Sequence, residues 1–91
     1  MSEVSVVAMG PGQFEVQVTE GATTTTHQVS VSPEMTEELG GGIDQEELVR
    51  ASFDFLLERE PATSILREFS LDVIPQYFPD YREEILRRLQ S

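Results

Sequence analysis

Few residues of this chain have side chains suited to catalysis or metal binding. His27 is the only histidine and there is no cysteine, so a transition-metal site would need carboxylates around one imidazole. Alternation places His27 on the face shared with Val29 and Val31, which predicts a core histidine hydrogen-bonded to the backbone. No serine lies in a nucleophile-elbow motif. The sequence therefore predicts no catalytic residue, no metal site and no cofactor, with His27 kept as a weak ligand candidate.

Adjacent acidic residues and a glycine run need separate explanations. Each acidic pair lies in or near the first turn of a predicted helix, where the helix dipole favours negative charge. The two members of a pair diverge by about 100° around a helix, so they cannot hold one substrate together. The pairs are Glu37 with Glu38, Glu46 with Glu47, and Glu83 with Glu84.

The glycines at 40–42 precede a helix, as in phosphate-binding loops, but no lysine follows and Asp44 would repel a phosphate. We interpret them as a joint.

The charge is strongly and unevenly negative. The 91 residues contain 17 acidic and 6 basic side chains, giving a formal net charge of −11, and all six basic residues are arginine. Residues 1–49 contain no basic side chain. Such a surface repels phosphate, which argues against direct binding to nucleic acid or an anionic membrane. It is typical of a salt-adapted proteome or of a protein with a basic partner.

A cluster near the C-terminus combines aromatic residues with arginines. Tyrosine, phenylalanine and arginine are enriched at the centres of protein interfaces. The cluster consists of Tyr77, Phe78, Tyr81, Arg82, Arg87 and Arg88. It predicts a small non-enzymatic protein–protein interaction or regulatory module, whose partner is another protein or a second copy. Two alternatives stay open: a small-ligand or cation-binding protein, or minor hydrolase, centred on His27, and an acidic nucleic-acid mimic that binds a basic protein.

The hydrophobic pattern predicts the elements that position these residues. Alternating apolar and polar residues over 3–32, with turn signals at 10–12 and 20–22, predict a three-stranded antiparallel meander. Residues 33–39 are predicted to form a short helix capped by Ser32, residues 40–43 a glycine-rich joint, and residues 44–91 a helical part whose main helix is capped by Asp44. The fold class is α+β, one small domain with three to five short helices on one face of the sheet.

Within the helical part, the main helix runs from Gln45 to about Arg59. Its apolar residues lie on two sides, since Phe53 and Phe55 point in nearly opposite directions, so we expect it between the sheet and the other helices. Pro61 opens a short helix through Ile65 and Phe69. The last helix spans residues 80–90.

Several segments resemble a group of short, uncharacterised bacterial and archaeal proteins. The resembling segments are LLEREP at 56–61, SILREF at 64–69 and YFPDY at 77–81, and more loosely TTTHQV at 24–29. The resemblance implies a stand-alone small protein and implies no activity or ligand. The N-terminal residues lack the pattern of a signal peptide, and no stretch is long and apolar enough to span a membrane. We therefore expect a cytoplasmic protein.

Overall fold

A four-stranded sheet, in the order β1-β2-β3-β4, forms one layer of the molecule. The computed structural model describes residues 2–38 and 44–90. Strands β1 (Ser2–Gly10), β2 (Gln13–Glu20) and β3 (Thr23–Ser30) form the antiparallel meander that the sequence predicts. Because successive side chains of a strand alternate between faces, Phe14, Val16 and Val18 all turn to one side and are buried. The α+β fold class is confirmed.

Two tight turns join these strands, and each contains a glycine with positive φ. Gly12 has φ +68° after Pro11, and Gly21 has φ +60°. A Cβ at Gly12 would lie 2.8 Å from the carbonyl oxygen of Val31, whereas a Cβ at Gly21 would have no neighbour within 4 Å. The Val31 N–H also donates to the Gly12 carbonyl over 2.9 Å. The first turn therefore needs glycine both for its conformation and for its close packing.

This difference predicts unequal effects of the same substitution. Gly21→Ala should lower the free energy of unfolding by about 1 kcal/mol, the lower end of the cost of a left-handed non-glycine residue. Gly12→Ala adds a clash with backbone and should cost about 2–3 kcal/mol. Urea titration of both variants measures the two losses. Equal losses would show that the contact with Val31 is irrelevant.

The segment after Pro61 differs from its prediction. Instead of a helix through Phe69, it forms one 3₁₀ turn, η1 (Ala62–Ser64), and then strand β4 (Glu68–Ser70). Strand β4 runs parallel to β3, with Val29 paired to Phe69. The helix prediction was therefore wrong. Pairing with the open edge of β3 satisfies the backbone of this segment, and local periodicity does not reveal such a non-local partner.

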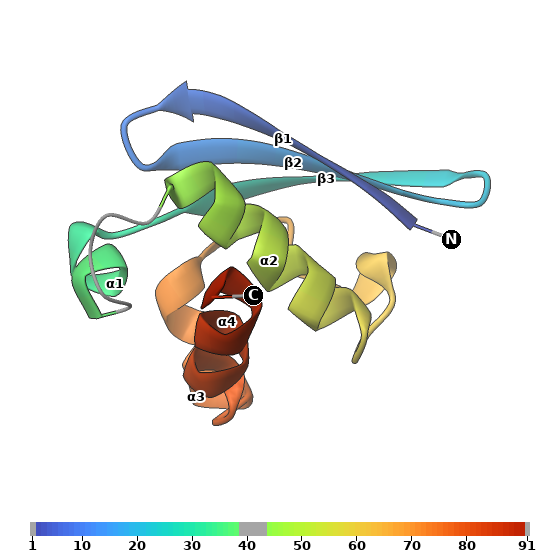
Figure 1. Ribbon diagram of the computed structural model, residues 1–91. Coiled ribbons are helices and arrows are strands. Elements are labelled where there is room, and N and C mark those ends of the chain that lie inside the picture. Colours follow the sequence, from blue (N-terminus) through green and yellow to red (C-terminus); the bar gives the residue numbers. More distant parts are fainter. Residues whose placement is uncertain (1, 39–43, 91) are drawn as a thin grey trace.

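The helices all lie on one face of the sheet, as predicted (Figure 1). They are α1 (Pro33–Glu38), α2 (Gln45–Leu57), α3 (Ile74–Tyr77) and α4 (Tyr81–Gln90), with the 3₁₀ turn η2 (Leu71–Val73) before α3. Ser32 accepts a hydrogen bond from the Met35 N–H and Asp44 one from the Glu46 N–H, so both predicted caps form. The predicted joint at 40–43 lies outside the described residues. Within the described ranges, no helix is long and apolar enough to cross a membrane.

Helix α2 lies between the sheet and α4, as its two apolar sides predict (Figure 1). On the sheet side, the ring of Phe53 packs against His27 of β3 and Phe69 of β4, with centroid distances of 5.3 and 6.0 Å. On the other side, the ring of Phe55 meets Phe78 and Tyr81 at 5.7 and 5.4 Å, edge to face. One helix thereby joins two parts of the core.

Candidate protein-interaction surface

The chain between α2 and α4 forms one wall of an apolar groove. The carboxylate of Glu20 accepts a hydrogen bond from the Ala62 N–H over 2.8 Å and so fixes η1 to the end of β2. Ser70 accepts from the Asp72 N–H and caps η2. Pro75 lies in the first turn of the short helix α3. Together these three features hold a turn-rich segment against the C-terminal end of α2.

The groove has a volume of about 200 Å³ and a lining that is apolar except for Glu60 and the Tyr77 hydroxyl. Its lining consists of Leu56, Glu60, Ile65, Leu66, Phe69, Val73, Ile74, Tyr77 and Phe78. Two of these side chains are unusually exposed for their type, Tyr77 at 72% and Leu66 at 56%. Exposed apolar side chains that line a concave surface are typical of interaction sites. We call this surface the Leu66–Tyr77 groove.

The six residues predicted as an interface do not form one surface. Tyr77 and Phe78 line the groove, and Phe78 is partly buried because its ring packs on Phe55. Tyr81 has no exposed surface and belongs to the core instead. Its position in line with Ile85, one helical turn further on, is the sequence signal for this burial.

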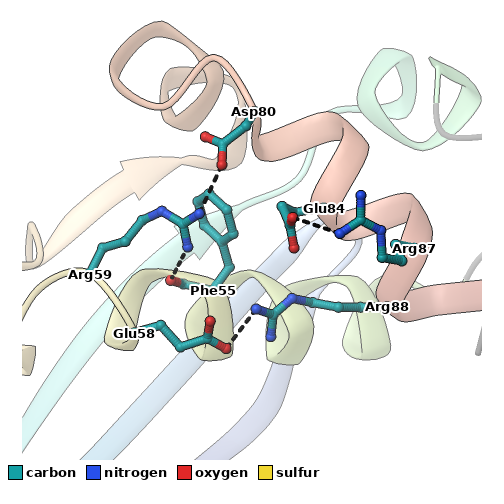
Figure 2. A network of polar contacts seen from close by, with 7 residues as sticks. All are labelled: Phe55, Glu58, Arg59, Asp80, Glu84, Arg87 and Arg88. Carbon is teal, nitrogen blue, oxygen red and sulfur yellow. Dashed lines mark hydrogen bonds and ion pairs between the residues drawn. The ribbon is translucent and has the colours of Figure 1, made fainter.

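The three arginines of the predicted interface lie on α4. Arg87 donates to Glu84 over 3.0 Å within α4, and Arg88 reaches across to Glu58, beyond the end of α2, over 2.6 Å (Figure 2). Arg82 is exposed in the first turn of α4. None of the three lines the groove. The contacts of Arg88 and Glu58 thus help hold the helices together.

Arg59 adds to the same network from the C-terminal side of α2. Its guanidinium carbon lies 3.8 Å from the centre of the Phe55 ring, and the group forms an ion pair with Asp80 over 2.8 Å (Figure 2). A cation over an aromatic face is attracted by the ring quadrupole. Arg59 therefore covers Phe55 and connects α2 to the residue before α4.

His27 is buried and both of its ring nitrogens have partners. Nδ1 lies 2.8 Å from the Leu66 carbonyl oxygen, which can only accept, so Nδ1 donates. In the neutral ring Nε2 then accepts from the Thr25 hydroxyl, at 2.9 Å. The side chain is 1% exposed, as the predicted core histidine requires. Among the described residues, no group of three His, Cys, Asp or Glu side chains is arranged to hold a metal ion.

A second buried polar pair joins α2 to α4. The Ser52 hydroxyl donates to the Leu48 carbonyl over 2.7 Å, so the Tyr81 hydroxyl donates to Ser52 over 2.6 Å. Burial raises the pKa of Tyr81 to about 12; the hydrogen bond with Ser52 opposes this shift and the negative charge of Asp72 adds to it. Both side chains are fully buried, and neither lines the Leu66–Tyr77 groove. The pair acts as a structural link.

The face of the sheet opposite the helices is open and mostly polar, with Val7 and Met9 of β1 as its exposed apolar residues. Glu3, Glu15 and Glu68 lie on it among serine, threonine and glutamine side chains, and the Gln28 amide donates to Glu15 over 3.3 Å. The carboxylates on this face are thus interspersed with neutral groups and do not form a continuous row.

Comparisons with protein-family models, with curated proteins and with solved structures found no match to this chain. The resemblance to short bacterial and archaeal proteins therefore stays a prediction. The fold is α+β, and the Leu66–Tyr77 groove is the surface on which we base a function.

Proposed function

We propose that this protein is a non-enzymatic interaction module that binds a short apolar and basic segment of another protein in the Leu66–Tyr77 groove. The observation that carries the proposal is the exposure of Leu66 and Tyr77 beside a groove of about 200 Å³. Fully burying a large apolar side chain contributes about 1.5–3 kcal/mol, and a partner's apolar side chain would recover part of this amount at each of these partly exposed residues.

The basic character of the partner follows from charge. Glu60 is the one charged residue of the groove lining. The chain as a whole carries a net charge of −11. A partner with lysine or arginine beside its apolar anchors gains attraction from Glu60 and is steered by the overall field.

Site-specific photo-crosslinking in the source cells tests this function. A benzophenone amino acid replaces Tyr77 in one variant and Met9 in the control. Met9 is 59% exposed but lies on β1, outside the groove. We expect adducts from position 77, with mass spectrometry locating the cross-link in an apolar segment that contains lysine or arginine. Equal yields of adducts with other proteins from both positions, or adducts confined to acidic segments, would contradict the proposal.

The cross-linked segment, made as a peptide, then permits a quantitative prediction. Leu66→Ala and Tyr77→Ala should each weaken its binding about tenfold, equivalent to about 1.4 kcal/mol, while Met9→Ala leaves the affinity unchanged. Glu60→Gln should weaken binding at about 0.1 M KCl and have little effect at about 1 M, where charges are screened. Fluorescence anisotropy measures the dissociation constants of the wild type and of the four variants.

A further inference from the structure

Strand β1 forms one edge of the sheet, so one side of its backbone has no partner strand. The Gln28 N–H donates to the Arg67 carbonyl over 2.6 Å, which turns the backbone groups of Gln28 away from β2. Opposite residues of an antiparallel pair face each other or both face away. The backbone N–H and C=O groups of Glu15, which is opposite Gln28, therefore point toward β1. Those of Val7, which is opposite Glu15, point toward β2.

Backbone direction alternates along a strand, so the N–H and C=O groups of Val4, Val6 and Ala8 point away from the sheet. One of these carbonyls is already in use. The Arg50 guanidinium donates to the Val4 carbonyl over 2.9 Å. Arg50 belongs to α2, which lies below the sheet in Figure 1. Arg50 thus protects part of an edge whose remaining groups are available for strand pairing.

The composition of β1 favours pairing with another strand. It contains one charged residue, Glu3, and no lysine or proline, the residues that commonly protect sheet edges. On the open face of the sheet, Val7 and Met9 are 52% and 59% exposed. A nine-residue edge strand with a single charged side chain is suited to adding a strand.

We propose that a second copy of this chain pairs with β1 in antiparallel orientation and that Arg50 restrains this pairing. A two-fold axis that passes beside Val6 places Val6 opposite Val6 of the second copy and Val4 opposite its Ala8. In this register, every residue whose backbone groups point outward is opposite another such residue. In this register the two Glu3 residues are separated by six residue steps, roughly 20 Å along the ribbon. That is more than twice the screening length of about 8 Å at physiological salt.

Two consequences follow for the strength of this pairing. The copies carry −11 each and repel one another, so the dimer forms more readily as salt screens the charge. Arg50 competes with the second copy for the Val4 carbonyl, so removing its guanidinium strengthens the dimer.

Sedimentation velocity at about 0.05, 0.5 and 3 M KCl measures the dimer dissociation constant. We expect this constant to fall at least tenfold between the lowest and the highest salt. At each salt concentration, the dimer dissociation constant of Arg50→Ala should be about tenfold lower than that of the wild type. Arg67→Ala is the matched control, because it removes the same charge from an exposed residue of the loop before β4. A monomer under every condition, or equal constants for the two variants, would overturn the proposal.

A second variant locates the contact on β1. Ala8→Pro removes an outward N–H while replacing an exposed side chain, so it should abolish the dimer formed by Arg50→Ala. Amide hydrogen exchange of the Arg50→Ala protein provides a test without proline. Exchange at Val6 and Ala8 should slow as protein concentration rises. A dimer that survives Ala8→Pro in a folded variant, or exchange at these amides that is independent of concentration, would show that β1 is not the interface.

Discussion

Replacing Tyr81 by alanine is expected to lower the free energy of unfolding by about 3–5 kcal/mol, the usual cost of deleting a large buried aromatic side chain. The ring is fully buried and packs edge to face on Phe55, and its hydroxyl donates to Ser52. The alanine variant loses the contact between α2 and α4 and leaves a cavity. Tyr81→Phe keeps the ring and loses the hydrogen bond, so it should cost about 1–2 kcal/mol. Urea titration measures both losses.

The same side chain predicts a loss of stability at high pH. The pKa of Tyr81 is about 12 in the folded protein, against an ordinary value of 10.0. The folded state therefore binds the phenol proton more tightly than the unfolded state does. The contribution of this proton to the free energy of unfolding is complete below pH 10. It decreases between about pH 10 and 12, by roughly 1.4 kcal/mol per pH unit.

The composition makes this pH dependence simple to measure. The chain has no lysine and no cysteine, and its two tyrosines are Tyr77 and Tyr81. We expect the urea midpoint of the wild type to fall over this pH range and that of Tyr81→Phe to fall much less. Tyr77→Phe is the control that assigns the effect to one of the two tyrosines. A slope that persists in Tyr81→Phe would contradict a proton held by the buried phenol.

The elements predicted best are those whose signals are local. Alternation of Phe14, Val16 and Val18 identified strand β2 and its buried face, because the period of two is a property of the strand itself. The period of a helix is likewise a local property, so the sequence correctly placed Phe53 and Phe55 on two different sides of α2. The caps at Ser32 and Asp44 also formed as predicted. Each of these features depends on neighbours within a few residues.

The features that were not predicted depend on contacts between distant parts of the chain. Strand β4 forms because the edge of β3 lies beside it, and the Ile65–Leu66–Phe69 spacing alone is compatible with a helix. The groove combines Leu56 of α2 with Tyr77 of α3, which are 21 positions apart in the sequence. Of the residues singled out from composition, Tyr77 and Phe78 do line this groove. Composition identified residue types suited to an interface but could not separate Tyr81 of the core from the surface residues.

His27 holds the loop before β4 to the meander, and its replacement should destabilise the protein strongly. Its Nδ1 donates to the carbonyl of Leu66, 39 residues away, and its ring packs on Phe53. His27→Phe keeps an aromatic ring but leaves the Leu66 carbonyl without this donor and Thr25 without its partner. We expect the free energy of unfolding to fall by about 2–4 kcal/mol. Thr25→Val removes only the hydrogen bond between the Thr25 hydroxyl and His27 Nε2, and it should lower the free energy of unfolding by about 0.5–1.5 kcal/mol.

The same variant distinguishes a structural histidine from a ligand-binding one. The Gln28 N–H bonds to the Arg67 carbonyl, next to Leu66, so His27→Phe should speed amide exchange at Gln28. Because Leu66 also lines the groove, the variant should bind the groove peptide more weakly. A histidine that served a ligand or a cation would instead give a variant of nearly unchanged stability. In that case the His27 ring signals of the wild type would shift in nuclear magnetic resonance titrations with divalent ions. A loss of less than about 0.5 kcal/mol in His27→Phe, the range of ordinary surface substitutions, would therefore reverse our interpretation of this residue.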